Sequence, residues 1–132
     1  MIVDASAVVP VLVDHPLAAK ARSVLVGSDL AAPALVLTQT ANTLWKYASR
    51  GGMTAEQINA GIRHIRAVIQ TVPDESLQVQ AVRLAIANRH PVYDCLYLAL
   101  ALQRREALAT ADRGMAALAR QLAIETELIE PQ

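Results

Sequence analysis

The chain has 132 residues, of which 54% are hydrophobic, and its twelve basic and twelve acidic residues give a formal net charge of zero. This length is typical of one domain, and such an apolar content can fill a core without cross-links. Zero net charge excludes a protein that coats nucleic acid by bulk positive charge, although it leaves room for a local basic patch.

The remaining composition favours a soluble cytoplasmic protein. Cys95 is the single cysteine, so no disulfide can form within the chain, which suits a reducing compartment. The N-terminus has no basic segment and Asp4 interrupts its apolar run, so we expect no signal peptide. No apolar run reaches the roughly 18–20 residues that a bilayer span needs. We therefore expect one domain over residues 1–132 and no membrane contact.

The first fifty residues alternate short extended segments with helical patterns. Ser6 is a candidate N-cap for the first helix, and Gly27 is a stop signal for the second. The predicted elements are a strand over Ile2–Asp4, helices over Ala5–Val13 and Leu17–Val26, an extended segment over Leu30–Pro33 and a helix over Ala34–Arg50.

The rest of the chain continues this alternation. Thr54 and Gln57 form a capping box, and the helix after them carries an isoleucine stripe at Ile58, Ile62, Ile65 and Ile69, whose main role is packing. A helix is predicted over Glu75–Asn88 from the helical spacing of Leu77, Val79, Val82 and Ile86. The other predicted elements are a strand at Thr71–Val72, a helix over Val92–Arg105, a strand over Ala107–Ala111, a helix over Gly114–Leu122 and a strand over Glu127–Ile129.

Short strands separated by helices favour parallel pairing with helical crossovers, in an α/β sandwich. In such sheets, ligands gather at the carboxyl ends of the strands. Two carboxylates, Asp4 and Asp112, each follow a predicted strand, and a third, Asp94, lies in the first turn of an apolar helix. Each has an ordinary structural explanation as a cap or turn residue, so their joint placement carries the argument.

Three carboxylates in one cleft would repel, since two charges about 4 Å apart cost on the order of 4 kcal/mol at an effective dielectric constant near 20. A divalent cation removes this penalty. Oxygen ligands without a His or Cys cluster favour Mg²⁺ or Mn²⁺ over Zn²⁺. The residues alone therefore suggest a metal site at Asp4, Asp94 and Asp112.

Four ordered blocks, MIVDASAVV, APALVLTQTANTLWK, VYDCLYLALA and TADRG, resemble the PIN-domain ribonucleases, and specifically the VapC-type toxins of VapBC toxin–antitoxin systems. The resemblance implies a PIN-like three-layer α/β/α sandwich with a short central, mainly parallel sheet. It also implies a Mg²⁺- or Mn²⁺-dependent endoribonuclease that forms a homodimer and is inhibited by a cognate VapB-type antitoxin. The family's metal-site aspartates fall on Asp4, Asp94 and Asp112.

The second block departs from the family pattern, in which a glutamate stands near the start of the helix. Gln39 occupies the matching position, and no other acid between Leu30 and Gly52 replaces it. Glutamine keeps a carbonyl acceptor but lacks the charge and cannot serve as a general base. We expect weaker metal binding and reduced or absent cleavage. The substitution is either natural or introduced to silence a toxic nuclease, and the three intact acids slightly favour the latter.

Two other functions stay open at this stage. One is a catalytically silent PIN-fold module that binds RNA or the antitoxin, which Gln39 favours. The other is a phospho-accepting α/β regulator, which also clusters aspartates but fits the four blocks poorly.

Several further side chains are candidates for supporting roles. Ser6 and Thr110 each lie two residues from an acidic position and could bond a carboxylate. His90 lies four residues before Asp94 and could orient a group near the cleft, but a loop role is the main expectation. Cys95 is expected to be a small packed thiol. For Trp45, we expect a role in packing or in an oligomer interface rather than in base stacking. An apolar groove beside the isoleucine stripe could receive an amphipathic antitoxin helix.

Overall fold

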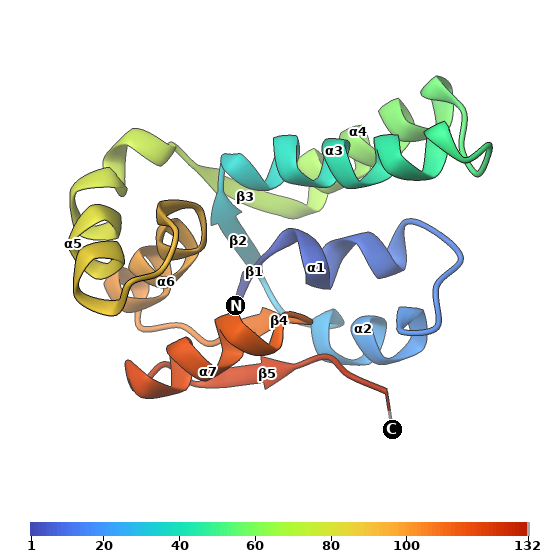
Figure 1. Cartoon of the computed structure of the whole chain (residues 1–132). Helices are drawn as coiled ribbons and strands as arrows, with labels where there is room; N and C mark the ends of the chain where they lie inside the picture. Colours follow the sequence, from blue (N-terminus) through green and yellow to red (C-terminus); the bar gives the residue numbers. More distant parts are fainter. Residues whose placement is uncertain (132) are drawn as a thin grey trace.

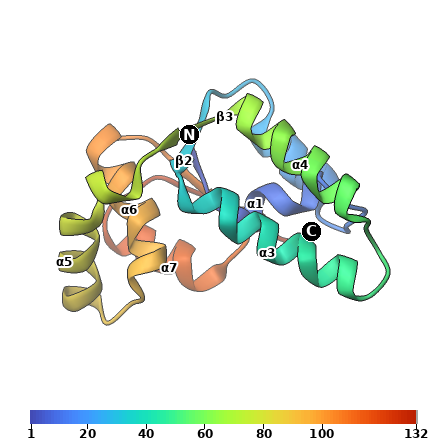
Figure 2. The ribbon, with the colours of Figure 1, turned by 90° about the horizontal axis from the view of Figure 1, so that it is seen from above.

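Five short strands pair in parallel in the computed structural model, which describes residues 1–131 (Figures 1 and 2). The order across the sheet is β3-β2-β1-β4-β5. This arrangement confirms the predicted α/β class and the parallel sheet. The strands are β1 (Ile2–Val3), β2 (Leu30–Pro33), β3 (Ile69–Val72), β4 (Leu108–Thr110) and β5 (Thr126–Leu128).

Every connection between successive strands contains helix, because parallel strands cannot be joined by a tight hairpin. No helix within residues 1–131 has the length and apolar character needed to span a membrane. The helices are α1 (Ala5–Val8), the 3₁₀ helix η1 (Val9–Val11), α2 (Ala18–Leu25), α3 (Leu35–Ser49), α4 (Ala55–Val68), the 3₁₀ helix η2 (Asp74–Ser76), α5 (Gln78–Asn88), α6 (Val92–Arg104) and α7 (Arg113–Gln121).

Helix α6 is the centre of the core. Its seven consecutive residues from Cys95 to Ala101 are buried, so the helix is apolar on all sides. One side contacts β1, β2 and β4, and α5 packs against another side, which places α5 outside α6 in Figure 1. This packing fixes the start of α6, and therefore Asp94, relative to the sheet.

The strand order places a crevice between β1 and β4. The chain leaves β1 for β2 and β3 on one side of the sheet, then crosses to β4 and β5 on the other side. In open parallel sheets this switch in direction forms the ligand-binding crevice at the carboxyl ends of the strands. Asp4 follows β1 directly and Asp112 follows β4 by two residues, so both lie at this crevice.

The first predicted helix is shorter than expected. Ala5–Val13 was predicted as one helix, but α1 ends at Val8 and a 3₁₀ turn follows. Pro10 explains the change, because it has no N–H to continue the α-helical hydrogen bonds. The prediction that Ser6 caps this helix is also wrong, since Asp4 is the N-cap.

The prediction for α5 identified the helix but assigned the wrong face to the core. Leu77 is fully buried, whereas Val79 and Ile86 are 68% and 76% exposed. Val79, Val82 and Ile86 lie on one helical face, which points to solvent, while Ala81 is buried. In addition, Ile69 belongs to β3, so the isoleucine stripe of α4 ends at Ile65.

Candidate active site

Asp4 is held by hydrogen bonds from the start of α1 and the end of β4. Ser6 Oγ donates to Oδ1 at 2.6 Å, and Thr110 Oγ1 donates to Oδ2 at 2.6 Å. The Ala7 N–H also donates to Oδ1 at 3.1 Å, because Asp4 caps α1. The expectation that Ser6 and Thr110 bond a carboxylate is confirmed. Both carboxylate oxygens of Asp4 therefore have fixed directions.

The environment of Asp4 changes its acidity. Only 6% of the residue is exposed, and this burial raises the pKa of the carboxyl group above its ordinary value. The hydrogen bonds from Ser6, Thr110 and Ala7 lower the pKa, and the charge of Asp112 raises it, but burial has the largest effect. Asp4 is thus a buried acid that would be stabilised in its charged form by a nearby cation.

Asp112 joins the same hydrogen-bond network through the backbone. Its Oδ1 accepts from the Met115 N–H at 2.9 Å, so it is the N-cap of α7. Its own N–H donates to Thr110 Oγ1 at 3.0 Å. The Thr110 hydroxyl thus contacts both Asp4 and the backbone of Asp112, which ties the ends of β1 and β4 together.

Asp94 enters the site from the first turn of α6, and His90 contacts it. His90 Nε2 lies 2.7 Å from Asp94 Oδ2. The left-handed backbone of Arg89, with φ of 52°, ends α5 and leads the chain into the turn that contains His90. His90 lies in the segment between α5 and α6, as predicted, and from there it contacts Asp94. The four-residue spacing to Asp94, just before a helix, was the available signal for this contact.

Gln39 lies in the second turn of α3 and pairs with a residue that sequence reasoning missed. Tyr97 Oη donates to Gln39 Oε1 at 2.7 Å. Tyr97 is fully buried, and this burial, followed by the charges of Asp4, Asp74 and Asp94, raises the pKa of its hydroxyl group. The hydroxyl therefore stays protonated. Its position three residues after Asp94 places it on the same side of α6.

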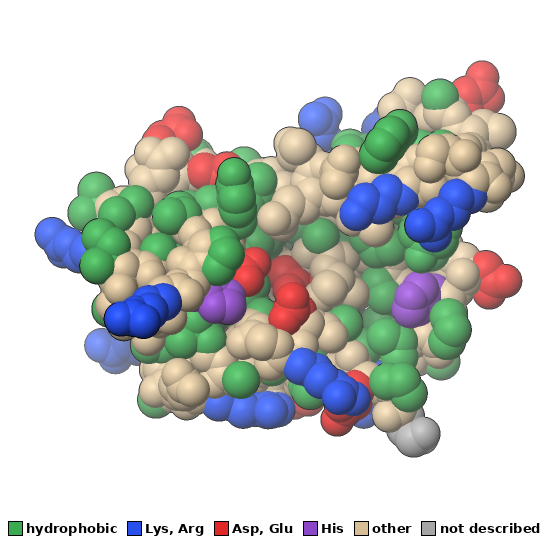
Figure 3. Space-filling view, in the orientation of Figure 1, with side chains coloured by type: hydrophobic (Ala, Val, Ile, Leu, Met, Phe, Trp, Pro, Cys, Tyr) green, Lys and Arg blue, Asp and Glu red, His purple; other side chains and the backbone are tan. Residues whose placement is uncertain are grey.

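All four predicted site residues line one cavity of about 280 Å³. Figure 3 shows acidic side chains gathered in a hollow at the centre of the face that carries α3 above and α7 below. No lysine or arginine is among the lining residues that the structure describes. The lining residues are Asp4, Ala5, Ser6, Gln39, Asn42, Thr43, Asp94, Tyr97 and Asp112.

A family model described as the PIN domain matches residues 1–121. The chain belongs to the PIN-domain family. The PIN fold is a nuclease fold and is commonly metal-dependent.

One solved structure similar to this PIN domain is the crystal structure of PAE2754 from Pyrobaculum aerophilum. The TM-score is 0.73 and the sequences are 21% identical, with 95% of this chain and 81% of that chain covered. At this identity the likeness supports the shared fold alone. No curated protein sequence matches the chain.

The cavity of this PIN domain is lined by ligand groups that a hard divalent cation prefers. Its carboxylate, amide and hydroxyl oxygens are ligands of the kind that Mg²⁺ and Mn²⁺ prefer. Within residues 1–131, no three acidic, His or Cys side chains lie close enough together to surround an ion. Mg²⁺ nevertheless fits such a cavity, because it usually keeps several waters and takes only one or two carboxylates from the protein.

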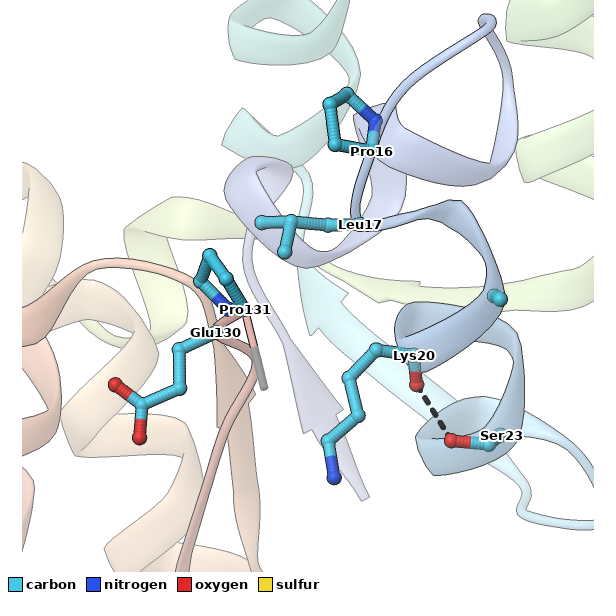
Figure 4. Close-up of a pocket in the computed structure, with 7 residues that line it drawn as sticks. Pro16, Leu17, Lys20, Ser23, Glu130 and Pro131 are labelled. Atoms are coloured by element: carbon cyan, nitrogen blue, oxygen red, sulfur yellow. Dashed lines mark hydrogen bonds between the residues drawn. The ribbon is translucent and has the colours of Figure 1, made fainter.

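A second hollow, of about 380 Å³, has a different character. It lies between α2 and the residues after β5, where Lys20 and Glu130 are its charged side chains (Figure 4). Glu130 also pairs with Arg113 at 3.6 Å. This hollow holds no group of carboxylates, so it is a poor candidate for a metal-dependent site.

The raised pKa of Asp4 predicts a pH dependence of stability in metal-free protein. Between the ordinary value of 3.8 and the higher folded value, the folded chain binds more protons than the unfolded chain. The free energy of unfolding should therefore fall as pH rises through this interval. Relative to Asp4→Asn, wild-type protein should lose stability from pH 3.8 upward, as measured by urea unfolding with EDTA.

The exposed Asp29→Asn variant is the control for removing a surface carboxylate. A stability difference between wild type and Asp4→Asn that stays constant, or grows in favour of wild type as pH rises, would contradict this account of Asp4.

Proposed function

We propose that this PIN domain is a metal-dependent endoribonuclease that hydrolyses RNA phosphodiester bonds as the toxin of a type II toxin–antitoxin pair in the cytoplasm. Asp4, Asp94 and Asp112 hold Mg²⁺ or Mn²⁺ in this proposal, either directly or through the waters that the ion keeps. The observation that carries it is that three carboxylates line one cavity at the crevice of the sheet, and that within residues 1–131 no lysine or arginine lines it. The PIN fold and its common metal dependence support the same assignment.

The surrounding residues fix the orientation of each carboxylate. Ser6 and Thr110 orient Asp4, and His90 holds one oxygen of Asp94. The backbone of α7 fixes one oxygen of Asp112. A bound divalent ion would supply activation of water and stabilisation of the charge that develops on the phosphate.

Gln39 limits this activity in the proposal. It brings no charge to the cavity and cannot accept a proton as a general base. Its carbonyl oxygen also accepts a hydrogen bond from Tyr97. These features favour the alternative function, a catalytically silent PIN-fold module that binds RNA or an antitoxin, if the remaining three carboxylates do not suffice for cleavage.

Changing Gln39→Glu should increase Mg²⁺-stimulated RNA cleavage, because the cavity gains a negative charge and a possible proton acceptor. We expect about a tenfold or greater increase in rate, which corresponds to about 1.4 kcal/mol in the activation free energy. The measurement is cleavage of a fluorophore–quencher RNA with Mg²⁺ and with EDTA.

Gln39→Leu is the matched variant without charge, and Asp94→Asn is the variant that removes a proposed ligand. Equal rates for wild type and Gln39→Glu would show that the missing charge is unimportant. Full activity of Asp94→Asn would remove the metal-dependent mechanism.

A groove on the far part of the α3–α4 hairpin supports the antitoxin as a partner. It has a volume of about 660 Å³ and lies beside the chain segment after η1. Its lining includes the apolar side chains of Leu12, Val13 and Met53 and the small residues Ala60 and Gly61. This position differs from the expected one, because the isoleucine stripe does not line the groove. An amphipathic helix of a VapB-type antitoxin is the occupant that we propose.

Ala60→Glu should weaken the complex with the product of the neighbouring reading frame, because it places a charge and bulk inside the groove. The measurement is co-purification after co-expression, with quantification by calorimetry. Ala67→Glu, on the same helix but outside the groove, is the control. Equal affinities of the two variants would exclude this groove as the antitoxin site.

The outer face of α5 supports the proposed homodimer. Val79, Val82 and Ile86 are exposed along one side of this helix, and Tyr93 at the start of α6 is also exposed. Contiguous apolar side chains at a surface favour a protein–protein contact. We propose that two copies of the chain bury this face against each other.

Ile86→Glu should shift the chain from dimer to monomer, because it places a charge on each side of the proposed contact. Sedimentation velocity over a range of concentrations measures this shift. Val26→Glu, at a similarly exposed valine distant in sequence, controls for the added charge. A dimer that persists in Ile86→Glu, or a monomeric wild type, would exclude this interface.

A further inference from the structure

We infer that Tyr97 orients the Gln39 side chain so that its amide nitrogen faces the cavity, and that Gln39 therefore binds a phosphate oxygen of the RNA rather than the metal ion. The inference rests on the proposed nuclease function and assigns a substrate-positioning role to a residue that replaces a carboxylate. Its tests separate it from that function.

The first step is the fixed direction of the Tyr97 hydroxyl. Tyr97 is fully buried in α6, and its O–H donates to Gln39 Oε1 at 2.7 Å. Within residues 1–131 this is the only hydrogen bond of the hydroxyl group. Turning the amide over would place an N–H against the hydroxyl and leave the buried phenolic hydrogen without this acceptor, which is costly. The hydrogen bond therefore selects one orientation of the amide.

The second step follows from what remains of the Gln39 amide. Its single oxygen is turned toward Tyr97 and accepts one hydrogen bond there, and its nitrogen carries two N–H donors with no hydrogen bond inside residues 1–131. Gln39 lines the cavity, so these donors are available to a ligand there. N–H donors repel a cation and attract an anionic oxygen, so position 39 is suited to a phosphate group.

The third step concerns the cavity as a whole. Gln39, Asn42 and Thr43 lie on α3 and line the cavity, where Gln39 and Asn42 bring amide groups and the Thr43 hydroxyl donates to the Gln39 backbone carbonyl oxygen at 3.1 Å. The carboxylates come from the ends of β1 and β4 and from α6. The carboxylates repel a phosphodiester, and hydrogen-bond donors on α3 offset part of this repulsion even when no cation is bound. The side-chain amide groups on α3 supply such donors without adding charge to the cavity.

A glutamate at position 39 could contact Tyr97 and the metal ion at the same time through different oxygens. It has two acceptor oxygens, so Tyr97 could hold one while the other faces the ion. In the Gln39 chain the same hydroxyl bonds the only side-chain oxygen, so an ion can reach no more than the second lone pair of that oxygen. Removing the Tyr97 hydroxyl should therefore raise the metal affinity when residue 39 is glutamine. It should not raise the metal affinity when residue 39 is glutamate.

The first experiment measures Mn²⁺ affinity by calorimetry, without RNA, for wild type, Tyr97→Phe, Gln39→Glu and the double variant. In the Gln39 background, Tyr97→Phe should raise the affinity by about two- to threefold or more, since contacting side chains commonly couple by about 0.5 kcal/mol or more. In the Gln39→Glu background it should leave the affinity unchanged or lower it. Tyr47→Phe, at the far end of α3, is the control and should change neither.

A loss of Mn²⁺ affinity by the same factor in both backgrounds would overturn the inference, because it would show that Tyr97 acts only on the structure of the site. Thermal unfolding of each variant checks that it is folded. If Asp4→Asn and Asp94→Asn leave Mn²⁺ affinity unchanged, the proposed metal function fails, and the RNA measurement below still tests the role of Gln39.

The second experiment measures binding of a short fluorescein-labelled single-stranded RNA in EDTA by fluorescence anisotropy. Gln39→Leu should weaken binding by about tenfold, because a hydrogen bond to a charged group is worth about 1.5–3 kcal/mol. Gln121→Leu, on the exposed surface of α7, is the matched control and should bind as wild type does. Equal binding by Gln39→Leu and wild type, or no binding by either, would overturn the inference.

Discussion

The hydrogen bonds from Ser6 and Thr110 to Asp4 are the contacts on which the site depends. They join the end of β1 to the end of β4, and the backbone of Asp112 bonds the same threonine hydroxyl. A buried carboxylate is stable only when its oxygens have partners, so the two hydroxyl groups let the fold keep an acid at the crevice of the sheet. Burial also raises the pKa of Asp4, so a cation in the cavity would stabilise its charged form.

Helices α3 and α6 turn this crevice into a two-sided site. The buried helix α6 carries Asp94 toward the sheet, and Tyr97 on the same helix reaches across to Gln39 on α3. One wall is therefore acidic and the other carries neutral amides and hydroxyls. This division suits a reaction in which an anionic substrate must approach a set of carboxylates. It also explains how the chain can keep a PIN-type site with glutamine at position 39.

Much of the fold could be predicted from the sequence because local signals and topology agree. The capping box at Thr54 and the aspartates after two strands were readable in the sequence. The face of α5 was not, since an apolar stripe at Val79, Val82 and Ile86 looks the same whether it packs in the core or against another chain. Tyr97 was missed as a site residue, and an orienting role for His90 was ranked below a loop role. Their contacts depend on how α6 lies against α3 and on a left-handed turn at Arg89. Those are tertiary features that helical spacing suggests but cannot select.

The central proposal is that one hard dication binds in the cavity at the crevice of the sheet, held by Asp4, Asp94 and Asp112 either directly or through the waters that the ion keeps. Anomalous diffraction from crystals of this protein grown with Mn²⁺ tests it most directly. The account predicts an anomalous peak inside the cavity, within bonding reach of Asp4 or Asp94 and absent from crystals of Asp94→Asn. Mn²⁺ bound only elsewhere, with this cavity empty at saturating concentration, would contradict the account.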